Sequence, residues 1–256
     1  MDEGFDAWLG ALEGRHLADL SFAEVRRGLE ALSRRYVARN PAGEAPLARA
    51  ALDGRGKRAA FALFYGPLHY LVVRHVVGAL GLEALPLEQV VDLGCGTGAA
   101  GAAWARSSKG RPPRLLGIEA NAWAAAEARF GWRTLGLEGR VDVRDAHGIR
   151  LPGGRAGIVL GYVVNELDPP RRDTLLGKLL DAGRAGAVIL IVEPIARPVT
   201  RAWWGPWAEA FIQAGGRSDE WRFRVRLPDL LARLAHAAGL DHRELTARTL
   251  CLPARA

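Results

Sequence analysis

A glycine-rich segment near the middle of the chain carries the residue types best suited to chemistry. It reads Asp92-Leu93-Gly94-Cys95-Gly96-Thr97-Gly98. The short apolar run Val90–Leu93 precedes it, and a helical pattern, Ala99–Arg106, follows it. Glycines at a strand-to-helix turn let the backbone approach a ligand closely and leave the first N–H groups of the helix accessible. The segment therefore predicts a ligand-binding turn.

The same segment contains the pattern of a dinucleotide-binding turn, from Gly96 to Gly101, which alone is weak evidence. A dinucleotide would place an anionic pyrophosphate at this helix N-terminus, where Asp92 would repel it. S-adenosylmethionine has no phosphate and carries a cationic amino group and a sulfonium. Asp92 therefore favours S-adenosylmethionine as the cofactor.

Two further acids follow predicted strands. Glu119 ends the run Leu115–Glu119, 21 residues after Gly98, and can accept hydrogen bonds from both ribose hydroxyls, a role that fits NAD equally. Asp145 follows a third run and suits the adenine amino group. We expect Ala120 and Ala146, beside these acids, to line the same site. Ligands of open α/β sheets bind at the carboxyl ends of the strands, where all three acids would lie.

Short apolar runs alternate with helical patterns from Val90 onward, which predicts βαβ units around a mostly parallel sheet. Residues 1–83 read as a helical N-terminal region, with a capping box at Ser21 and Glu24 and a second helix, 57–80, that a kink at Gly66-Pro67 interrupts. Residues 84–256 are expected to form the cofactor-binding domain, and 242–252 to supply one or two final strands. Residues 194–227 are either a lid or a packed excursion.

The glycine-rich segment, Glu119 and Asp145 resemble the cofactor motifs of class I S-adenosylmethionine-dependent methyltransferases, over about residues 85–195. This resemblance implies an α/β, Rossmann-like sheet of about seven strands, with S-adenosylmethionine over its carboxyl edge. The implied cofactor contacts are Asp92, Gly94, Cys95, Gly96, Gly98, Glu119, Ala120, Asp145, Ala146 and Tyr162.

More narrowly, the chain is similar to the small-ribosomal-subunit-associated methyltransferase-like family of bacteria and mitochondria. The similarity is carried by Leu71–Leu80, Gly161–Leu167, Ile191–Pro194 and Asp219–Pro228. That family commonly has a cysteine cluster before the segment matching 219–228, which implies an iron–sulfur or zinc site. Residues 195–218 contain no cysteine here, so we expect no metal site.

The fourth predicted strand, 158–164, leads into the candidate catalytic residues. Tyr162, Asn165 and Glu166 would face the methyl group in this fold class. Asn165 could hold an amine or amide nucleophile and Glu166 could act as a base. The alternative is that Asn165 caps the following turn and Glu166 is solvated.

Other residues allow two interpretations each. Tyr65 and Tyr70 cover the cofactor or pack in the core, while His69 and His75 fit core or surface positions better than catalytic ones. The tryptophans Trp203, Trp204 and Trp207 stack on a planar substrate or pack in the core. The alternating arginines Arg222, Arg224 and Arg226 bind phosphate or form a solvated edge.

Composition sets the remaining limits. The 256 residues carry a formal net charge of +7, of which residues 195–256 contribute +4. The two cysteines cannot form a disulfide framework, and no clean apolar run is long enough to cross a bilayer, so we expect a cytoplasmic protein with no membrane partner.

Three functions therefore remain open. The first two are a methyltransferase acting on a small molecule and one acting on ribosomal RNA or the small subunit. The third is a catalytically inactive S-adenosylmethionine-binding protein used in ribosome assembly or as an interaction module.

Overall fold

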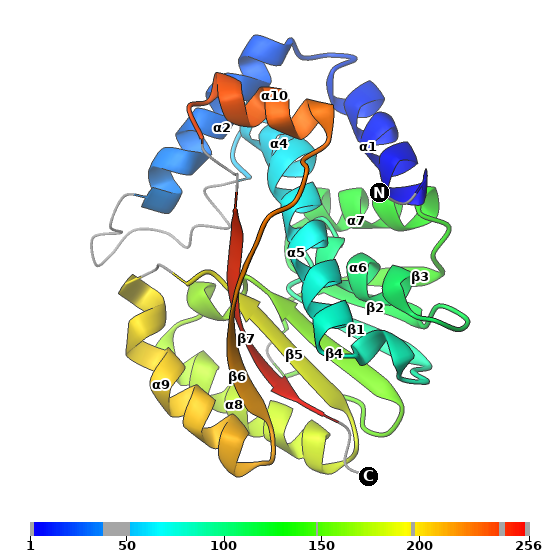
Figure 1. Ribbon diagram of the computed structural model, residues 1–256, viewed down its shortest axis with the longest axis vertical. Helices are drawn as coiled ribbons and strands as arrows, with labels where there is room; N and C mark the ends of the chain where they lie inside the picture. The colour runs from blue at the N-terminus through cyan, green and yellow to red at the C-terminus, as the bar shows by residue number, and fades with distance from the viewer. Residues whose placement is uncertain (1–2, 38–51, 147, 196–197, 241–243, 254–256) are drawn as a thin grey trace.

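The computed structural model describes residues 3–37, 52–146, 148–195, 198–240 and 244–253. Within these ranges the chain forms one seven-stranded sheet in the order β3-β2-β1-β4-β5-β7-β6 (Figure 1). The strands are β1 (Gln89–Leu93), β2 (Arg114–Glu119), β3 (Gly139–Val143), β4 (Ala156–Gly161), β5 (Val188–Glu193), β6 (Arg217–Phe223) and β7 (Leu245–Leu252). The first five run parallel, and β7 is antiparallel to both β5 and β6. The predicted α/β sheet is thus confirmed.

The expectation that residues 242–252 supply one or two final strands is confirmed, since β7 lies there among the described residues. A further late strand, β6, lies within the segment 194–227, where we expected a lid or a packed excursion. Only Arg222 of the three alternating arginines lies within β6, since the strand ends at Phe223. Side chains along β6 alternate between exposed and half-buried, as in a solvated edge strand.

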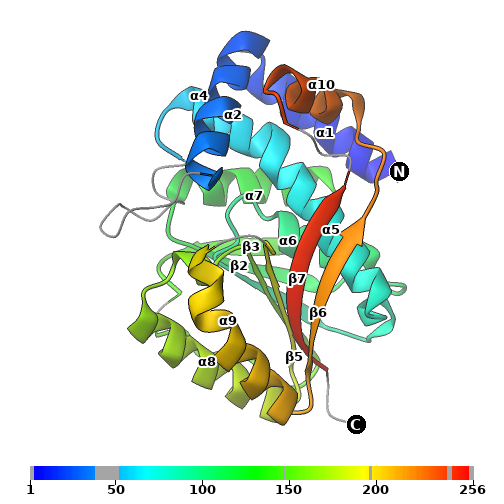
Figure 2. The ribbon, with the colours of Figure 1, turned by 60° about the vertical axis from the view of Figure 1, so that its left-hand side comes forward.

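Helices cover both faces of the sheet, as Figures 1 and 2 show. The helices that follow the strands are α6 (Ala99–Ser107), α7 (Ala122–Thr134), η3 (Val164–Glu166), α8 (Pro169–Arg184), α9 (Pro198–Gln213) and α10 (Asp229–Ala237). Trp203 and Trp207 of α9 are buried, in the same apolar cluster as Ile189 of β5 and Leu250 of β7. The segment after β5 is therefore a packed helix followed by a strand, and the core interpretation of these two tryptophans is confirmed.

The N-terminal region is helical where the structure describes it. Its helices are α1 (Glu3–His16), α2 (Phe22–Val37), α4 (Arg55–Ala60), the π-helix η1 (Phe61–Tyr65), α5 (Gly66–Ala79) and the 3-10 helix η2 (Leu82–Ala84). The predicted capping box is present, because the Ser21 N–H donates to the Glu24 carboxylate at 2.8 Å and the Glu24 N–H donates to the Ser21 hydroxyl at 3.3 Å. The expected interruption at Gly66-Pro67 takes the form of the π-helical turn η1 immediately before Gly66.

The helix Arg55–Ala79 is long and apolar enough, by length and composition, to cross a membrane. However, 72% of its most apolar window is buried inside the protein. We therefore interpret it as a core helix, which the sheet and the other N-terminal helices surround.

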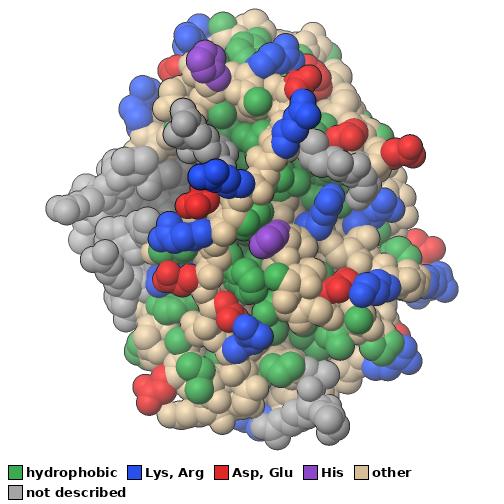
Figure 3. All heavy atoms as spheres, in the orientation of Figure 1, with side chains coloured by type: hydrophobic (Ala, Val, Ile, Leu, Met, Phe, Trp, Pro, Cys, Tyr) green, Lys and Arg blue, Asp and Glu red, His purple; other side chains and the backbone are tan. Residues whose placement is uncertain are grey.

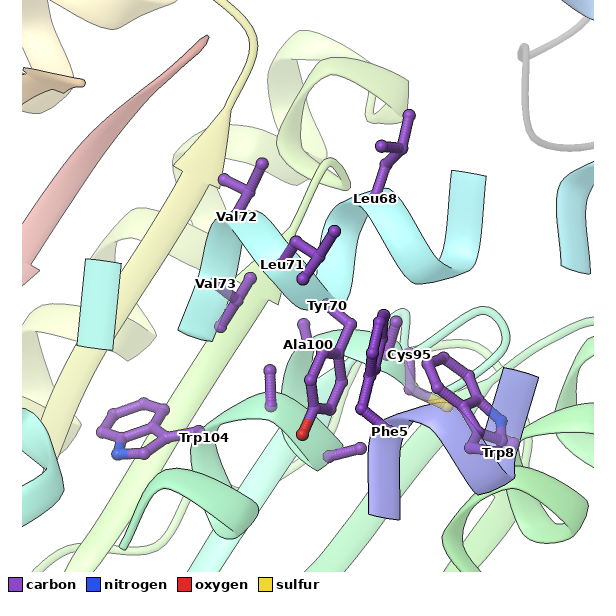
Figure 4. Packing of buried hydrophobic residues seen from close by; sticks show 14 of the residues in the cluster. Phe5, Trp8, Leu68, Tyr70, Leu71, Val72, Val73, Cys95, Ala100 and Trp104 are labelled. Carbon is purple, nitrogen blue, oxygen red and sulfur yellow. The ribbon is translucent and has the colours of Figure 1, made fainter. Parts of the chain in front are cut away.

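Helix α1 closes the core over the glycine turn. Figure 4 shows Phe5 and Trp8 of α1 against Tyr70 of α5, with Cys95 of the turn beside them. The rings of Phe5 and Tyr70 are stacked with centroids 4.8 Å apart. One apolar cluster contains these residues and the sheet residue Val90, so the N-terminal region and the sheet share a core. Tyr70 is fully buried, as the core interpretation requires.

An ion-pair cluster fixes the end of α1 on α7. The Glu127 carboxylate is buried and accepts hydrogen bonds from Arg15 at 2.9 Å and His16 at 3.1 Å. Burial by itself raises the pKa of Glu127, but the bonds and charges of His16 and Arg15 outweigh it and leave the pKa below its usual value. The carboxylate therefore stays ionised and holds α1 in place.

Candidate active site

The glycine turn between β1 and α6 is fixed by close packing. Gly94, Gly96 and Gly98 all have positive φ, the region that favours glycine. A Cβ on Gly94 would lie 2.9 Å from Val163, which follows β4, and a Cβ on Gly98 would lie 2.5 Å from the Trp132 indole. The Trp132 Nε1–H donates to the Gly98 carbonyl at 2.8 Å. These two glycines thus let the turn pack against β4 and α7.

Gly96 differs from its neighbours because space beside it is open. Within the part of the chain that the structure describes, a Cβ there would meet one atom within 4 Å, on the ring of Phe61 at 3.9 Å. The Gly96 N–H donates to the Glu119 carboxylate at 2.8 Å, and the other oxygen of Glu119 accepts from the Asn121 N–H at 2.7 Å. Gly96 and the half-buried Glu119 therefore form a surface that a ligand can approach.

Asp92 is fully buried, which differs from the sequence-based picture of a carboxylate in direct contact with the ligand. Its Oδ2 accepts from the Gly101 N–H in α6 at 2.8 Å, and its Oδ1 has no hydrogen-bond partner among the described residues. Burial raises the pKa of Asp92 to about 7, with a smaller contribution from the charge of Glu119, against the opposing bond from Gly101. The carboxyl group thus supports the turn from beneath and ionises near neutral pH.

Cys95 also points into the protein. Its side chain is buried, and its sulfur lies 2.8 Å from the position that a Cβ on Gly117 would take. Burial raises the pKa of the Cys95 thiol well above its usual value. A ligand above the turn could therefore contact the backbone of Cys95 but not its side chain. Ala120, just beyond β2, is exposed at the same edge of the sheet.

Asp145 and Ala146 follow β3 at this edge. The Arg144 N–H donates to the Glu119 carbonyl at 3.0 Å, so the chain leaves β3 beside the end of β2. Asp145 is exposed and pairs with Arg171 of α8 at 3.2 Å, whereas Ala146 is half-buried. The structure therefore places both residues near Glu119, with Arg171 as a competing partner for Asp145.

The turn after β4 contains Tyr162, which is the one non-glycine residue with positive φ (63°) among those the structure describes. Its backbone N–H donates to the Val192 carbonyl at 2.8 Å, and its ring stacks on His69 of α5 with centroids 3.8 Å apart. A tyrosine adopts this conformation rarely, and such strain is concentrated at functional sites.

Asn165 lies in a buried network that the sequence did not reveal. Glu193 at the end of β5 is fully buried; its Oε1 accepts from the Val164 N–H at 2.8 Å and its Oε2 accepts from the Asn165 side chain. The Trp203 indole donates to the Asn165 oxygen at 3.0 Å. Asn165 therefore anchors the turn through its bonds to Glu193 and Trp203, while Glu166 is half-buried at the turn's end.

Four rings gather beside the glycine turn, and we call them the aromatic box: Phe61, Tyr65, His69 and Tyr162. All four are half-buried. The centroid of His69 lies 6.2 Å from those of Phe61 and Tyr65, and Gly66 in the same helix packs on the Thr97 hydroxyl. The spacing of four residues between 61, 65 and 69 marks one helix face in the sequence, but the same spacing is typical of core packing.

A hollow lies at the opposite end of the sheet, at the amino ends of the strands. It measures about 590 Å³ and is lined by the first residues of four strands, Gln89, Arg114, Gly139 and Ala156. It contains neither the glycine turn nor the acids that follow the strands. We take the carboxyl edge as the candidate active site because the glycine turn and Glu119 lie there, and ligands of open α/β sheets bind at that edge.

No family model and no curated protein matches the sequence. Among solved structures, mitomycin 7-O-methyltransferase MmcR is 15% identical, with a TM-score of 0.52, and the match covers 96% of this chain and 72% of that chain. The "putative RNA methyltransferase PH1948" from Pyrococcus horikoshii is 12% identical, with a TM-score of 0.50, and the match covers 92% of this chain and 100% of that chain. The chain thus has the Rossmann-like fold of these methyltransferases.

Proposed function

We propose that the protein is an S-adenosylmethionine-dependent methyltransferase. The observation that carries the proposal is the pairing of Glu119 with the open Gly96. A pyrophosphate at this turn would need the Gly96 N–H, which already donates to a carboxylate, and it would meet the charge of Glu119. A ligand with a ribose and cationic groups would gain from the same carboxylate. This arrangement favours S-adenosylmethionine over a dinucleotide.

The described residues fit this cofactor. Gly96 leaves room for close approach, and the Oδ1 of Asp92 beneath the turn, which has no hydrogen-bond partner among the described residues, favours a positive charge nearby. Glu119 would accept from the ribose hydroxyls and Asp145 from the adenine amino group. When bound, the cofactor would supply a methyl group activated by a sulfonium. The chain's contribution is to position the acceptor and to exclude water at the turn after β4.

The acceptor is either RNA of the small ribosomal subunit or a small molecule. The resemblance to the small-ribosomal-subunit-associated methyltransferase-like family supports RNA as the acceptor. The exposed side chains of Arg222, Arg224 and Arg226 could contact RNA phosphates. Figure 3 shows basic and acidic side chains interspersed on the face that carries β6. Arg217 pairs there with Asp219 at 2.7 Å and Arg222 with Glu244 at 3.6 Å, which reduces the basic field available to RNA.

The alternative function is an S-adenosylmethionine-binding protein without methyl transfer. One observation favours it: the side chain of Asn165, the candidate for holding the nucleophile, already bonds to Glu193 and Trp203. Incubating the protein with radiolabelled S-adenosylmethionine and pools of RNA, small subunits and small molecules separates the two functions. Label in RNA or small subunits that falls with salt indicates an RNA acceptor. Binding without label in any pool supports the alternative.

Calorimetric titration tests the cofactor. We expect S-adenosylhomocysteine to bind and NAD not to bind. Glu119→Ala should weaken binding by about tenfold or more, since hydrogen bonds to a charged group contribute about 1.5–3 kcal/mol. Glu138→Ala, which removes an exposed carboxylate at the opposite end of the sheet, is the matched control and should leave binding unchanged. Binding of NAD alone would contradict the proposal.

A further inference from the structure

The edge strand β6 has one row of backbone groups that faces away from the sheet. It is the last strand in the sheet order and pairs with β7 on one side. Among the described residues, Arg217–Phe223 makes no backbone hydrogen bond beyond those to β7. Figure 1 shows β6 in front of β7, with no described element drawn across it. An exposed edge of this kind can pair with a strand of another chain.

The strand β6 lacks the features that commonly prevent such pairing. Edge strands are often very short, or they contain proline or lysine. β6 has seven residues and contains neither of these residue types. The other edge strand, β3, has five residues, and its two charged side chains, Arg140 and Asp142, already pair with each other at 3.4 Å. Of the two edges, β6 is therefore the better suited to pairing.

The charges on β6 are complementary to those of a second copy of the chain. Glu220 and Arg222 are both exposed and lie two residues apart, so their side chains share one face of the strand. Among the described residues Glu220 forms no ion pair, and Arg222 lies 3.6 Å from Glu244, beyond hydrogen-bonding distance. In an antiparallel pair of β6 strands centred on Trp221, each Glu220 lies directly opposite Arg222 of the other copy. Opposite charges at such positions stabilise a strand pair.

The other face of β6 favours the same register. Trp221 and Phe223 are half-buried on the side of α5, where His75 stacks on Phe223 with centroids 3.7 Å apart. Centring the pair on Trp221 places the two copies of this side chain opposite each other, and aromatic pairs across strands are stabilising. Moving the centre to Glu220 or Arg222 would instead place like charges opposite each other. Both faces of the strand therefore select one register.

We infer that two copies of the protein associate by antiparallel pairing of their β6 strands, centred on Trp221. The two seven-stranded sheets then form one continuous sheet. This dimer goes beyond the proposed function and does not depend on it. Because one strand edge and its flanking side chains form a small interface, we expect a dissociation constant in the micromolar range.

Sedimentation analysis in the ultracentrifuge, from about 1 to 300 µM protein, tests the inference. The wild type should approach twice its mass of 27.6 kDa as the concentration rises. Glu220→Arg and Arg222→Glu should each weaken the dimer by about tenfold or more, since each creates two like-charge pairs in the interface. An equimolar mixture of these two variants should dimerise, because one carries two positive charges at the interface and the other two negative charges. The double variant should dimerise for the same reason.

Asp142→Arg, on the other edge strand, is the matched control and should leave the dimer unchanged. Circular dichroism and thermal melting verify that each variant folds. A wild type that stays monomeric at the highest concentration would overturn the inference. So would a dimer that Glu220→Arg does not weaken or that Asp142→Arg abolishes. Loss of the dimer in both single variants without recovery in their mixture would also contradict pairing in this register.

Discussion

Replacing Asp92 by asparagine should change how the stability of the protein depends on pH. Burial raises the pKa of this carboxyl group from 3.8 to about 7 in the folded protein. Between these two values the folded protein keeps a proton that the unfolded chain has lost. The free energy of unfolding therefore falls as pH rises from about 4 to 7, and this loss levels off above pH 7.

The size of the effect follows from the pKa difference. A difference of about 3 units corresponds to about 4 kcal/mol, since each unit is worth about 1.4 kcal/mol. Asparagine does not ionise, and its oxygen can still accept from the Gly101 N–H. Its amide group would replace the unpartnered Oδ1, at a cost of about 1–3 kcal/mol that does not depend on pH.

Urea denaturation of both proteins at pH 4.5, 6, 7 and 8, at constant ionic strength, measures this difference. We expect Asp92→Asn to gain stability relative to the wild type as pH rises, by about 3 kcal/mol between pH 4.5 and 8. The other titrating groups cancel in the comparison. A stability difference that stays constant over this range would refute the argument, because it would mean that Asp92 is ionised in the folded state throughout.

Substitutions at two other positions test the packing of the site. Gly98→Ala should lower the free energy of unfolding by about 2–4 kcal/mol in urea denaturation, because its Cβ would lie 2.5 Å from Trp132 at a φ of 79°; a neutral result would mean that the turn can shift. Glu193→Ala should cost about 2–5 kcal/mol in the same assay, since it leaves buried N–H donors unpaired, and Glu193→Gln should cost less. Equal effects of the two Glu193 variants would contradict the network.

Local signals in the sequence predicted much of the fold. The glycine turn, the apolar run of each parallel strand and the Ser21–Glu24 capping box are local patterns, so pattern and spacing are sufficient to predict them. The strand β6 was missed because its sequence, Arg217–Phe223, is mostly polar and exposed. It forms a strand by pairing with β7, about 28 residues further on, and no local pattern reveals such a partner.

Spacing in the sequence predicts which residues lie at the candidate site, but it does not predict which way their side chains point. Residues at the ends of β1 and β2 were identified from spacing, yet the direction of Asp92 depends on its bond to Gly101 in the following helix. The bond between Asn165 and Glu193 joins residues 28 apart in sequence, and it gives a candidate catalytic residue an anchoring contact that spacing does not reveal. The stack of His69 on Tyr162 likewise joins two distant segments.

A crystal structure with S-adenosylhomocysteine bound tests the central claim most directly. We predict the ribose hydroxyls within hydrogen-bond distance of Glu119, the adenine beside Asp145, and the sulfur at the gap between β1 and β4. A phosphate-bearing ligand seated against Gly94–Gly98, or S-adenosylhomocysteine bound at the amino ends of the strands, would contradict it.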